Sequence, residues 1–239
     1  MRHLPVFLDL QAAPALVVGG GRVAARKLAL LRSAGATVTV IAPTACPEVA
    51  EQAKRSELTW HVREFEPGDV AGVRVVFAAT DDEATNEAVA QAARAAGIPV
   101  NVADDGARSS FILPAIVDRG VVTVAIGTEG AAPVLATRLR TQLEQELHPR
   151  LGRLAEIARE FRPEVAATLQ AGAPRRAFWS DIFSGSAADA ILRGDEEVAR
   201  TVIERHLAGQ ETSVSRTGRV ILVGAGPGDP ELLTLKAVR

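Results

Sequence analysis

The chain of 239 residues is poor in several features that would narrow its function, and each shortage excludes a class of protein. A single cysteine, Cys46, excludes an internal disulfide and any metal site built from cysteine pairs, and it is typical of a reducing cytoplasm. No uninterrupted apolar run approaches the roughly 18 residues of a membrane span. The N-terminal stretch is broken by Pro5 and Asp9, unlike a signal peptide. We therefore expect a soluble cytoplasmic protein with no membrane partner.

The charge balance is equally unspecific. Lys and Arg together number 27 against 29 acidic residues, which gives a net charge of −2 and no basic field for a nucleic acid. An anionic ligand would therefore need a locally basic pocket. The histidines, which lie far apart in the sequence, do not indicate a resident metal, and none is predicted; they are His3, His61, His148 and His206.

Strand-like and helix-like patterns alternate between residues 15 and 104. Apolar, β-branched runs bounded by glycine or proline predict strands, and amphipathic stretches predict helices. The strands are expected at 15–20, 37–43, 58–62, 73–81 and 99–104, and the helices at 22–33 and 83–96. This alternation predicts an α/β fold with a doubly wound parallel sheet, in which ligands bind at the carboxyl ends of the strands.

The pattern changes in the second half. Two β-runs within 110–128 surround the turn residues Asp118 and Gly120 and predict a hairpin, which a long amphipathic helix follows at 134–147. The hairpin is too apolar to stand exposed, and an exposed edge strand invites pairing, so we expect this segment to join two subunits. Residues 149–209 are expected to be wholly helical, with breaks at Pro149, Pro163, Pro174 and Gly194.

The last residues differ again. A polar linker (209–218) leads to another strand, glycine loop and helix start, and about twenty residues are too few to bury a core. We expect them to begin a further domain of a longer protein. The predicted organisation is thus a nucleotide-binding domain, a dimerisation segment, a small helical domain, and a linker with a truncated domain, at 1–113, 114–148, 149–209 and 210–239.

The stretch "LVVGGGRVAARKLALL" (16–31) carries the most specific local signal. Gly19, Gly21 and Ala24 match the G-x-G-x-x-G/A pattern of dinucleotide-binding turns, and Gly20 lies between the two glycines. The free N–H groups of Arg22 and Val23 would face phosphates at the helix N-terminus. A plain strand-to-helix turn is the alternative, and the alternating context favours the dinucleotide.

One part of that fingerprint is missing. The acidic residue that grips the adenosine ribose should fall near residue 41, where the sequence reads "VIAPT". Backbone groups around Pro43 and the hydroxyl of Thr44 are the available substitutes. The sequence therefore leaves the preference between NAD and NADP open.

Polar residues also mark the ends of the later strands. We expect Thr80 to face the crevice and to contact ribose or nicotinamide, and Asp82 to cap the following helix. Asn101, which is polar inside an apolar strand, needs buried partners and is predicted to lie near the ligand. Asp104 ends the last strand, where it is either a functional base or a cap for the next turn, as Asp105 is expected to be.

Several of these stretches together resemble a known family. "LPVFLDL", "VVGGGRVAARK", "AATDDEATN", "NVADD" and "SFILPAIVDRG" are similar, in order and spacing, to the precorrin-2 dehydrogenase/sirohydrochlorin ferrochelatase family, over residues 1–208. The tail "VILVGAGPGDPELLTLKA" resembles the opening of the uroporphyrinogen-III C-methyltransferase domain, which follows in the fused protein. The order of the two pieces supports both identifications.

The resemblance implies a homodimer and two reactions at one site. Precorrin-2 would lose a hydride to NAD and a proton, which gives sirohydrochlorin, and ferrous iron would then enter as a substrate while two pyrrolic protons leave. The catalytic carboxylate of the family falls on Asp104. The implied substrate carries eight carboxylates, so cationic and hydroxyl groups should gather for it, and the candidates are Arg108, Arg119, Thr128 and Arg138, with Arg140 beside them.

Two other functions are kept as alternatives. The first is a family member that retains only the chelatase activity, which the intact Gly19, Gly21 and Asp104 disfavour. The second is a non-catalytic NAD-sensing module, which the family motifs disfavour.

Overall fold

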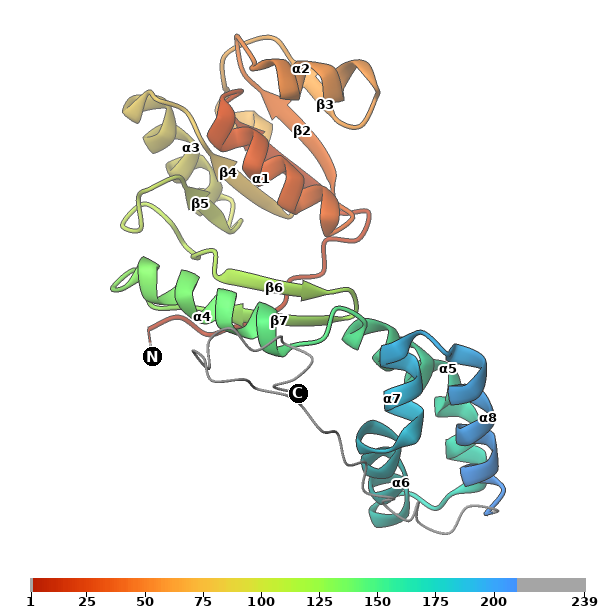
Figure 1. The fold of residues 1–239 in the computed structure, drawn as a ribbon. Helices are drawn as coiled ribbons and strands as arrows, with labels where there is room; N and C mark the ends of the chain where they lie inside the picture. The colour runs from red at the N-terminus through yellow and green to blue at the C-terminus, as the bar shows by residue number, and fades with distance from the viewer. Residues whose placement is uncertain (1, 210–239) are drawn as a thin grey trace, which may run out of the picture. The chain divides into compact units, whose positions relative to one another are not determined.

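The fold is described from a computed structural model, which describes residues 2–209 (Figure 1). The predicted linker and the start of a further domain at 210–239 lie outside the described residues. Contacts divide the described residues into two compact units, one made of residues up to Ile116 with Ala125–Thr141, the other of Val117–Val124 with the described chain after Thr141. Within residues 2–209, no helix combines the length and apolar character needed to cross a membrane. The division at 113 and 148 stays a proposal.

The first unit contains a five-stranded sheet in which every neighbouring pair is parallel. Its spatial order is β3-β2-β1-β4-β5, so the direction of winding reverses between β1 and β4. This confirms the predicted doubly wound, Rossmann-like sheet. The strands are β1 (Pro14–Val18), β2 (Thr37–Ile41), β3 (Thr59–His61), β4 (Val75–Ala78) and β5 (Val100–Val102).

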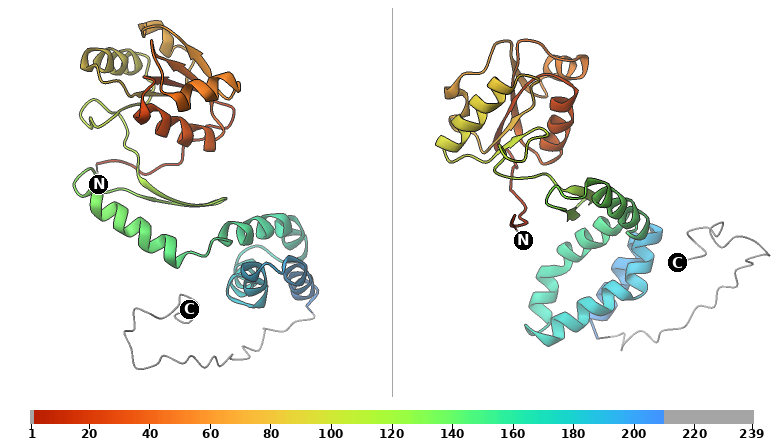
Figure 2. Two further views of the ribbon diagram at one scale, coloured as in Figure 1. Left: turned by 45° about the horizontal axis from the view of Figure 1, so that its top comes forward. Right: turned by 90° about the vertical axis from the view of Figure 1, so that its left-hand side faces the viewer.

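Helices cover both faces of this sheet, as the right-hand view of Figure 2 shows for α1 and α3. On one face, Leu28 and Leu31 of α1 (Arg22–Ser33) pack with Val17 of β1 in one buried cluster. On the other face, α3 (Glu83–Ala95) supplies Val89 and Ala93 to a second cluster with Leu16. The strands are apolar on both faces because both are buried.

The sequence analysis missed α2 (Pro47–Lys54), which follows β2 and precedes β3. Its signal was present, because Pro47 lies in the first turn, where a missing N–H costs nothing, and Glu48 follows it. The residue before the helix is Cys46, which caps it in extended conformation. Val49 anchors α2 in the same cluster as α1. A short 3₁₀ helix (Pro67–Val70) was also not predicted.

The outer edge of β5 is covered by its own continuation. The Val100 N–H donates to Ser110 Oγ at 2.8 Å, and the Val102 N–H donates to Ser109 Oγ at 2.9 Å. The Ser110 N–H in turn donates to the Val100 carbonyl at 2.8 Å. These bonds fold the chain after Asp104 back along the strand and fix the turn between them.

The predicted hairpin and helix are present. β6 (Ala115–Arg119) pairs with β7 (Val122–Ile126), and α4 (Pro133–Glu146) follows. The loop between β7 and α4 holds the N-terminal arm: the carboxylate of Glu129 accepts from the backbone N–H groups of Arg2 and His3 and lies 2.7 Å from His3 Nδ1. These bonds lower the pKa of Glu129 to about 2, with the His3 ring as the main cause.

The second unit is mainly helical, as predicted. Its helices are α5 (Leu151–Thr168), α6 (Ala173–Ser184), α7 (Ser186–Arg193) and α8 (Glu196–Leu207). Ile157, Phe178, Ile191 and Ile203, one from each helix, lie in one buried cluster. Gly194 ends α7 in the left-handed conformation, as a helix C-cap does.

The expected helix break at Pro163 was wrong, because α5 runs through it. Phe161 and Val165, on either side of this proline, are both buried in the helical core. We attribute the continuity of α5 to that burial, which offsets the hydrogen bond that proline removes. Pro174, by contrast, lies in the first turn of α6.

In the second unit, the backbone at Gly152 lies close to that of Arg119, and we predict that a side chain at residue 152 lowers stability. A Cβ on Gly152 would overlap the carbonyl oxygen of Arg119, which is backbone and cannot turn away. We expect Gly152→Ala to lower the free energy of unfolding by about 1–3 kcal/mol, as overpacking does. Urea unfolding followed by circular dichroism measures the change. Gly68→Ala is the control, since a Cβ there meets nothing within 4 Å; equal stability of the two variants would contradict the prediction.

Candidate functional site

The loops at the carboxyl ends of four strands line one cavity of about 650 Å³. It spans the point where the strand order reverses, which is where doubly wound sheets bind ligands. In the spatial order of the strands, its lining comes from the loops after β2, β1, β4 and β5. The lining residues are Ala42, Pro43, Thr44, Ala45 and Cys46; Gly19, Gly20, Gly21, Arg22 and Val23; Ala79, Thr80 and Asp81; and Ala103 and Asp104.

The three glycines at the centre have different reasons for lacking a side chain. Gly19 has φ +117° and its Cβ would overlap the Ala79 carbonyl oxygen, while a Cβ on Gly20 would overlap that of Thr44. Gly21 has φ −80°, and a Cβ there would meet nothing within 4 Å. The protein's own packing therefore requires glycine at 19 and 20 but not at 21. A bare backbone at 21 leaves room for a ligand at the start of α1.

The third small residue of the pattern packs as expected. Ala24 is fully buried in the cluster beneath α1. It lets the helix lie close to the sheet, so that its first N–H groups, those of Arg22 and Val23, border the cavity. This arrangement suits an anionic group such as a pyrophosphate.

At the β2 end, the unpredicted α2 completes the wall. The Cys46 N–H donates to the Gly20 carbonyl at 2.8 Å, which joins the loop after β2 to the glycine turn. No carboxylate lines this end among the described residues, and Pro43 and Thr44 do line it. The nearest acidic residue in α2 is Glu48, whose pKa is lowered by its own backbone N–H, by Cys46, and by Arg22. Sequence reasoning missed Ala45 and Cys46 because it missed this helix.

At the β4 end, a buried asparagine holds the loop. The side chain of Asn86 donates to the Thr80 carbonyl at 2.9 Å and accepts from the Thr80 hydroxyl, also at 2.9 Å. Thr80 borders the cavity as predicted, with Asp81 beside it. The prediction for Asp82 is confirmed, since it caps α3 by accepting from the Thr85 N–H, and bonds from Thr85 lower its pKa.

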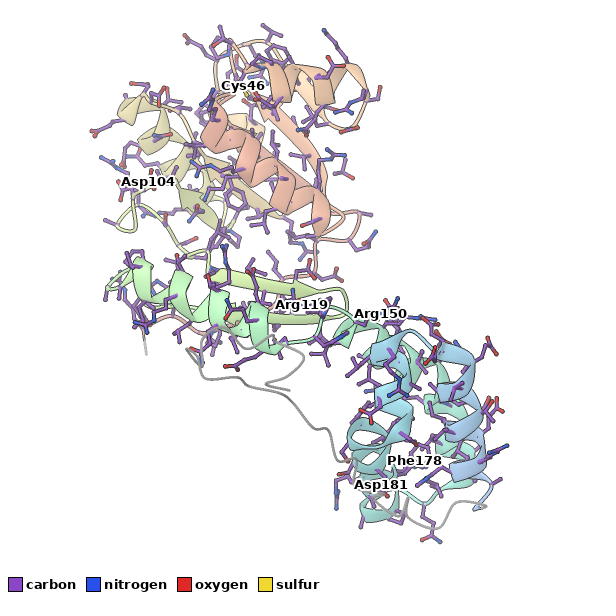
Figure 3. The ribbon with its side chains drawn as sticks, in the orientation of Figure 1. Cys46, Asp104, Arg119, Arg150, Phe178 and Asp181 are labelled. Carbon is purple, nitrogen blue, oxygen red and sulfur yellow. The ribbon has the colours of Figure 1, made fainter. Side chains whose placement is uncertain are left out.

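At the β5 end, Asp104 and Asp105 face different surroundings. Asp104, which Figure 3 labels, follows β5. It is exposed, borders the cavity, and has φ +58°. Asp105 accepts from the N–H groups of Ala107 and Arg108, and these bonds lower its pKa, with the Arg108 N–H as the main cause. Asp105 is therefore the turn cap that the sequence suggested. Asp104 has no such engagement with its own turn.

Asn101, predicted to lie near the ligand, is not among the residues that line the cavity. It is buried, and its amide donates to the Phe111 carbonyl at 3.0 Å. The buried amide of Asn101 thus has its hydrogen-bond partner in the segment that folds back along β5. The structure gives Asn101 a part in holding this chain against β5.

The residues predicted to gather around an acidic substrate are not brought together in this cavity. Arg108 pairs with Glu87 and Asp105, each at 2.7 Å. The guanidinium of Arg119 donates to the carbonyls of Glu144 and Leu147 at the end of α4. Both arginines are therefore used within the fold. Thr128 lies in the loop before α4 and Arg138 is exposed on α4; neither borders the cavity.

A metal site needs converging ligands. Among residues 2–209, no group of three or more His, Cys, Asp or Glu side chains lies close enough to hold an ion. The four histidines lie apart along the chain: His3 precedes β1, His61 ends β3, His148 follows α4 and His206 lies in α8.

The contrast between Gly20 and Gly21 gives a matched pair of variants. Gly21→Asp should fold with undiminished stability, because Gly21 is the N-cap of α1 and aspartate is a preferred cap. Its carboxylate would occupy the open space at the start of α1 and repel a pyrophosphate there, so we expect the affinity for NAD to fall at least about 10-fold. Gly20→Ala should instead lower the melting temperature through its overlap with Thr44. Calorimetry of both variants checks this, and undiminished NAD affinity in Gly21→Asp would refute it.

Two family models match stretches of this chain. A family model described as "Putative NAD(P)-binding" matches residues 6–115, and one for the sirohaem synthase dimerisation region matches 150–207. The chain is 25% identical to a solved structure of SirC, a precorrin-2 dehydrogenase, with a TM-score of 0.66 over 85% of this chain and 100% of that one.

Curated relatives match along the whole chain. Siroheme synthases of Methylococcus capsulatus and Pseudomonas aeruginosa are 48% and 45% identical to it and are covered over 51% of their own length. The chain thus spans about half the length of the curated relatives it matches. Over its whole length, the chain is similar to the N-terminal half of these siroheme synthases.

Proposed function

We propose that this chain is the NAD-dependent precorrin-2 dehydrogenase part of a siroheme synthase, and that the same site inserts ferrous iron into sirohydrochlorin. The observation that carries the proposal is the cavity itself, in which an open glycine turn and a free carboxylate, Asp104, lie at the carboxyl edge of one sheet. The siroheme synthase relatives and the SirC neighbour support the choice of substrate. The lone cysteine fits a cytoplasmic setting.

The order of the lining loops suggests how NAD would lie. The backbone at Gly21, Arg22 and Val23 would hold the pyrophosphate, and Pro43 with Thr44 would border the adenosine ribose. Thr80, fixed by Asn86, then borders the nicotinamide end, on the side of Asp104. When bound, NAD supplies an acceptor for the hydride of the substrate.

Asp104 is the group we assign to proton removal. Oxidation of precorrin-2 gives up a hydride and a proton, and entry of ferrous iron into sirohydrochlorin displaces two protons from ring nitrogens. Both steps need an acceptor within hydrogen-bond reach of the macrocycle. Asp104 is exposed and borders the cavity. Its carboxylate does not cap its own turn, whereas that of Asp105 does. One carboxylate thus serves both reactions.

The backbone at Asp104 agrees with this role. A non-glycine residue with φ +58° is a strained conformation, and such strain gathers at functional sites. Asp and Asn tolerate it better than other residues. Asp104→Asn therefore removes the basicity while preserving both the turn and the size of the side chain.

We expect Asp104→Asn to slow NAD-dependent oxidation of precorrin-2 and iron insertion by about 100-fold or more, the scale of lost general-base catalysis. The fold and the NAD affinity should persist. The absorbance change of the tetrapyrrole on mixing with NAD, and then with ferrous iron, measures the two rates. Asp105→Asn is the control and should have a much smaller effect, because its amide oxygen can still accept from Ala107 and Arg108.

The same assay decides between the proposal and its alternatives. A wild-type protein that binds NAD but leaves the spectrum of precorrin-2 unchanged would be a sensor. One that loads iron into sirohydrochlorin but does not oxidise precorrin-2 would be a chelatase only. Near-normal rates in Asp104→Asn with loss in Asp105→Asn would mean that the other carboxylate is the base.

We also propose a homodimer, which the family model for a dimerisation region supports. That model covers 150–207 and not the segment 114–148 that the sequence analysis favoured. The structure nevertheless leaves apolar side chains exposed on α4, Val134 at 82% and Leu135 at 49%, and on the N-terminal arm, Phe7 at 78%. Exposed apolar side chains of this size favour a protein contact.

We expect light scattering to give about twice the 25.1 kDa of one chain at micromolar concentration. Val134→Glu should shift the mass towards the monomer, because it would bury a charge in the contact. Val62→Glu is the control, at a residue exposed to 66% on the loop after β3. If only Phe183→Glu, in α6, dissociates the dimer, the helical region alone forms the contact.

A further inference from the structure

Lys27 of α1 has a position that neither the motif nor the comparisons explain. It lies four residues after Val23, which borders the cavity, and residues at this spacing share a face of a helix. Side chains of helical residues lean towards the N-terminus, and for Lys27 this is the direction of Val23 and the glycine turn. Asp104, the carboxylate at the β5 end of the cavity, raises the pKa of Lys27 and so opposes the effect of burial.

The ammonium of Lys27 is partly buried without being neutralised. Burial lowers its pKa, the charge of Asp104 raises it, and the neighbouring Arg26 lowers it. Among the residues that the structure describes, no carboxylate forms an ion pair or hydrogen bond with it. By contrast, two other partly buried cations, Arg108 and Arg153, are each bonded to two or more carboxylates. A partly desolvated cation with no direct partner is available to an anion that arrives with the ligand.

We propose that Lys27 is a substrate-binding residue, which takes a peripheral carboxylate of the tetrapyrrole at the Asp104 end of the cavity. This rests on the proposed function. The negative charge of Asp104 would repel the carboxylates of the macrocycle, although Asp104 must come within reach of its ring nitrogens. Lys27 offsets that repulsion on the same side of the site, and it fixes one edge of the macrocycle while its ring nitrogens face Asp104.

The test compares substrate affinity with turnover. In Lys27→Met, the Kd for sirohydrochlorin, measured by absorbance titration, and the KM for precorrin-2 should both rise about 10-fold or more, as the loss of a charged hydrogen bond predicts. The kcat and the NAD affinity should change less than about 2-fold. Lys27→Arg should restore most of the affinity. Arg26→Met is the matched control, because Arg26 is the exposed neighbour on α1 and should leave both constants unchanged.

Two results would overturn the inference alone. Unchanged tetrapyrrole affinity in Lys27→Met would show that the ammonium contacts no substrate carboxylate. A fall in kcat with unchanged KM would show that Lys27 acts through Asp104 instead. A wild-type protein that neither binds sirohydrochlorin nor oxidises precorrin-2 would overturn the proposed function itself, and this is read before any variant is made.

Discussion

The site depends on two close backbone contacts that leave no room for a side chain. Gly19 lies against the carbonyl of Ala79, and Gly20 lies against that of Thr44, so the ends of β1, β4 and β2 meet at a single turn. The Gly19 N–H also donates to the Ile41 carbonyl at 2.9 Å, and the Cys46 N–H to that of Gly20. Because these contacts involve backbone on both sides, relaxation cannot relieve them. The walls of the cavity are therefore set by the same atoms that close the sheet.

This constraint explains which parts of the structure could be predicted. The alternation of apolar runs and helical patterns is a local property, and it placed α1 and α3 within a residue or two of their bounds. Strand ends were predicted too long, since β1 stops at Val18 where the glycines leave the ladder. α2 was missed because its stretch follows a proline that ends β2, although a second proline, Pro47, marks the helix start.

The candidate site was predictable where function depends on the backbone and less so where it depends on side chains. The turn residues and Thr80 all border the cavity, because strand ends in a parallel sheet converge whatever their side chains do. Asn101, Arg108 and Arg119 were chosen for their chemistry, and each is used by the fold instead. Their partners, Phe111, Glu87 and Glu144, lie 10, 21 and 25 residues away in the sequence. No local pattern encodes such pairings.

The serines that follow β5 protect one edge of the sheet from pairing with another chain. An outer strand normally presents a row of unpaired peptide groups, on which another chain can add a strand. Here the hydroxyls of Ser109 and Ser110 occupy the N–H groups of Val102 and Val100. At the opposite margin of the sheet, β3 has only three residues, too few to template a long pairing. The addition of strands from other chains, the first step towards fibrils, is thereby blocked at the β5 edge and restricted at the β3 edge.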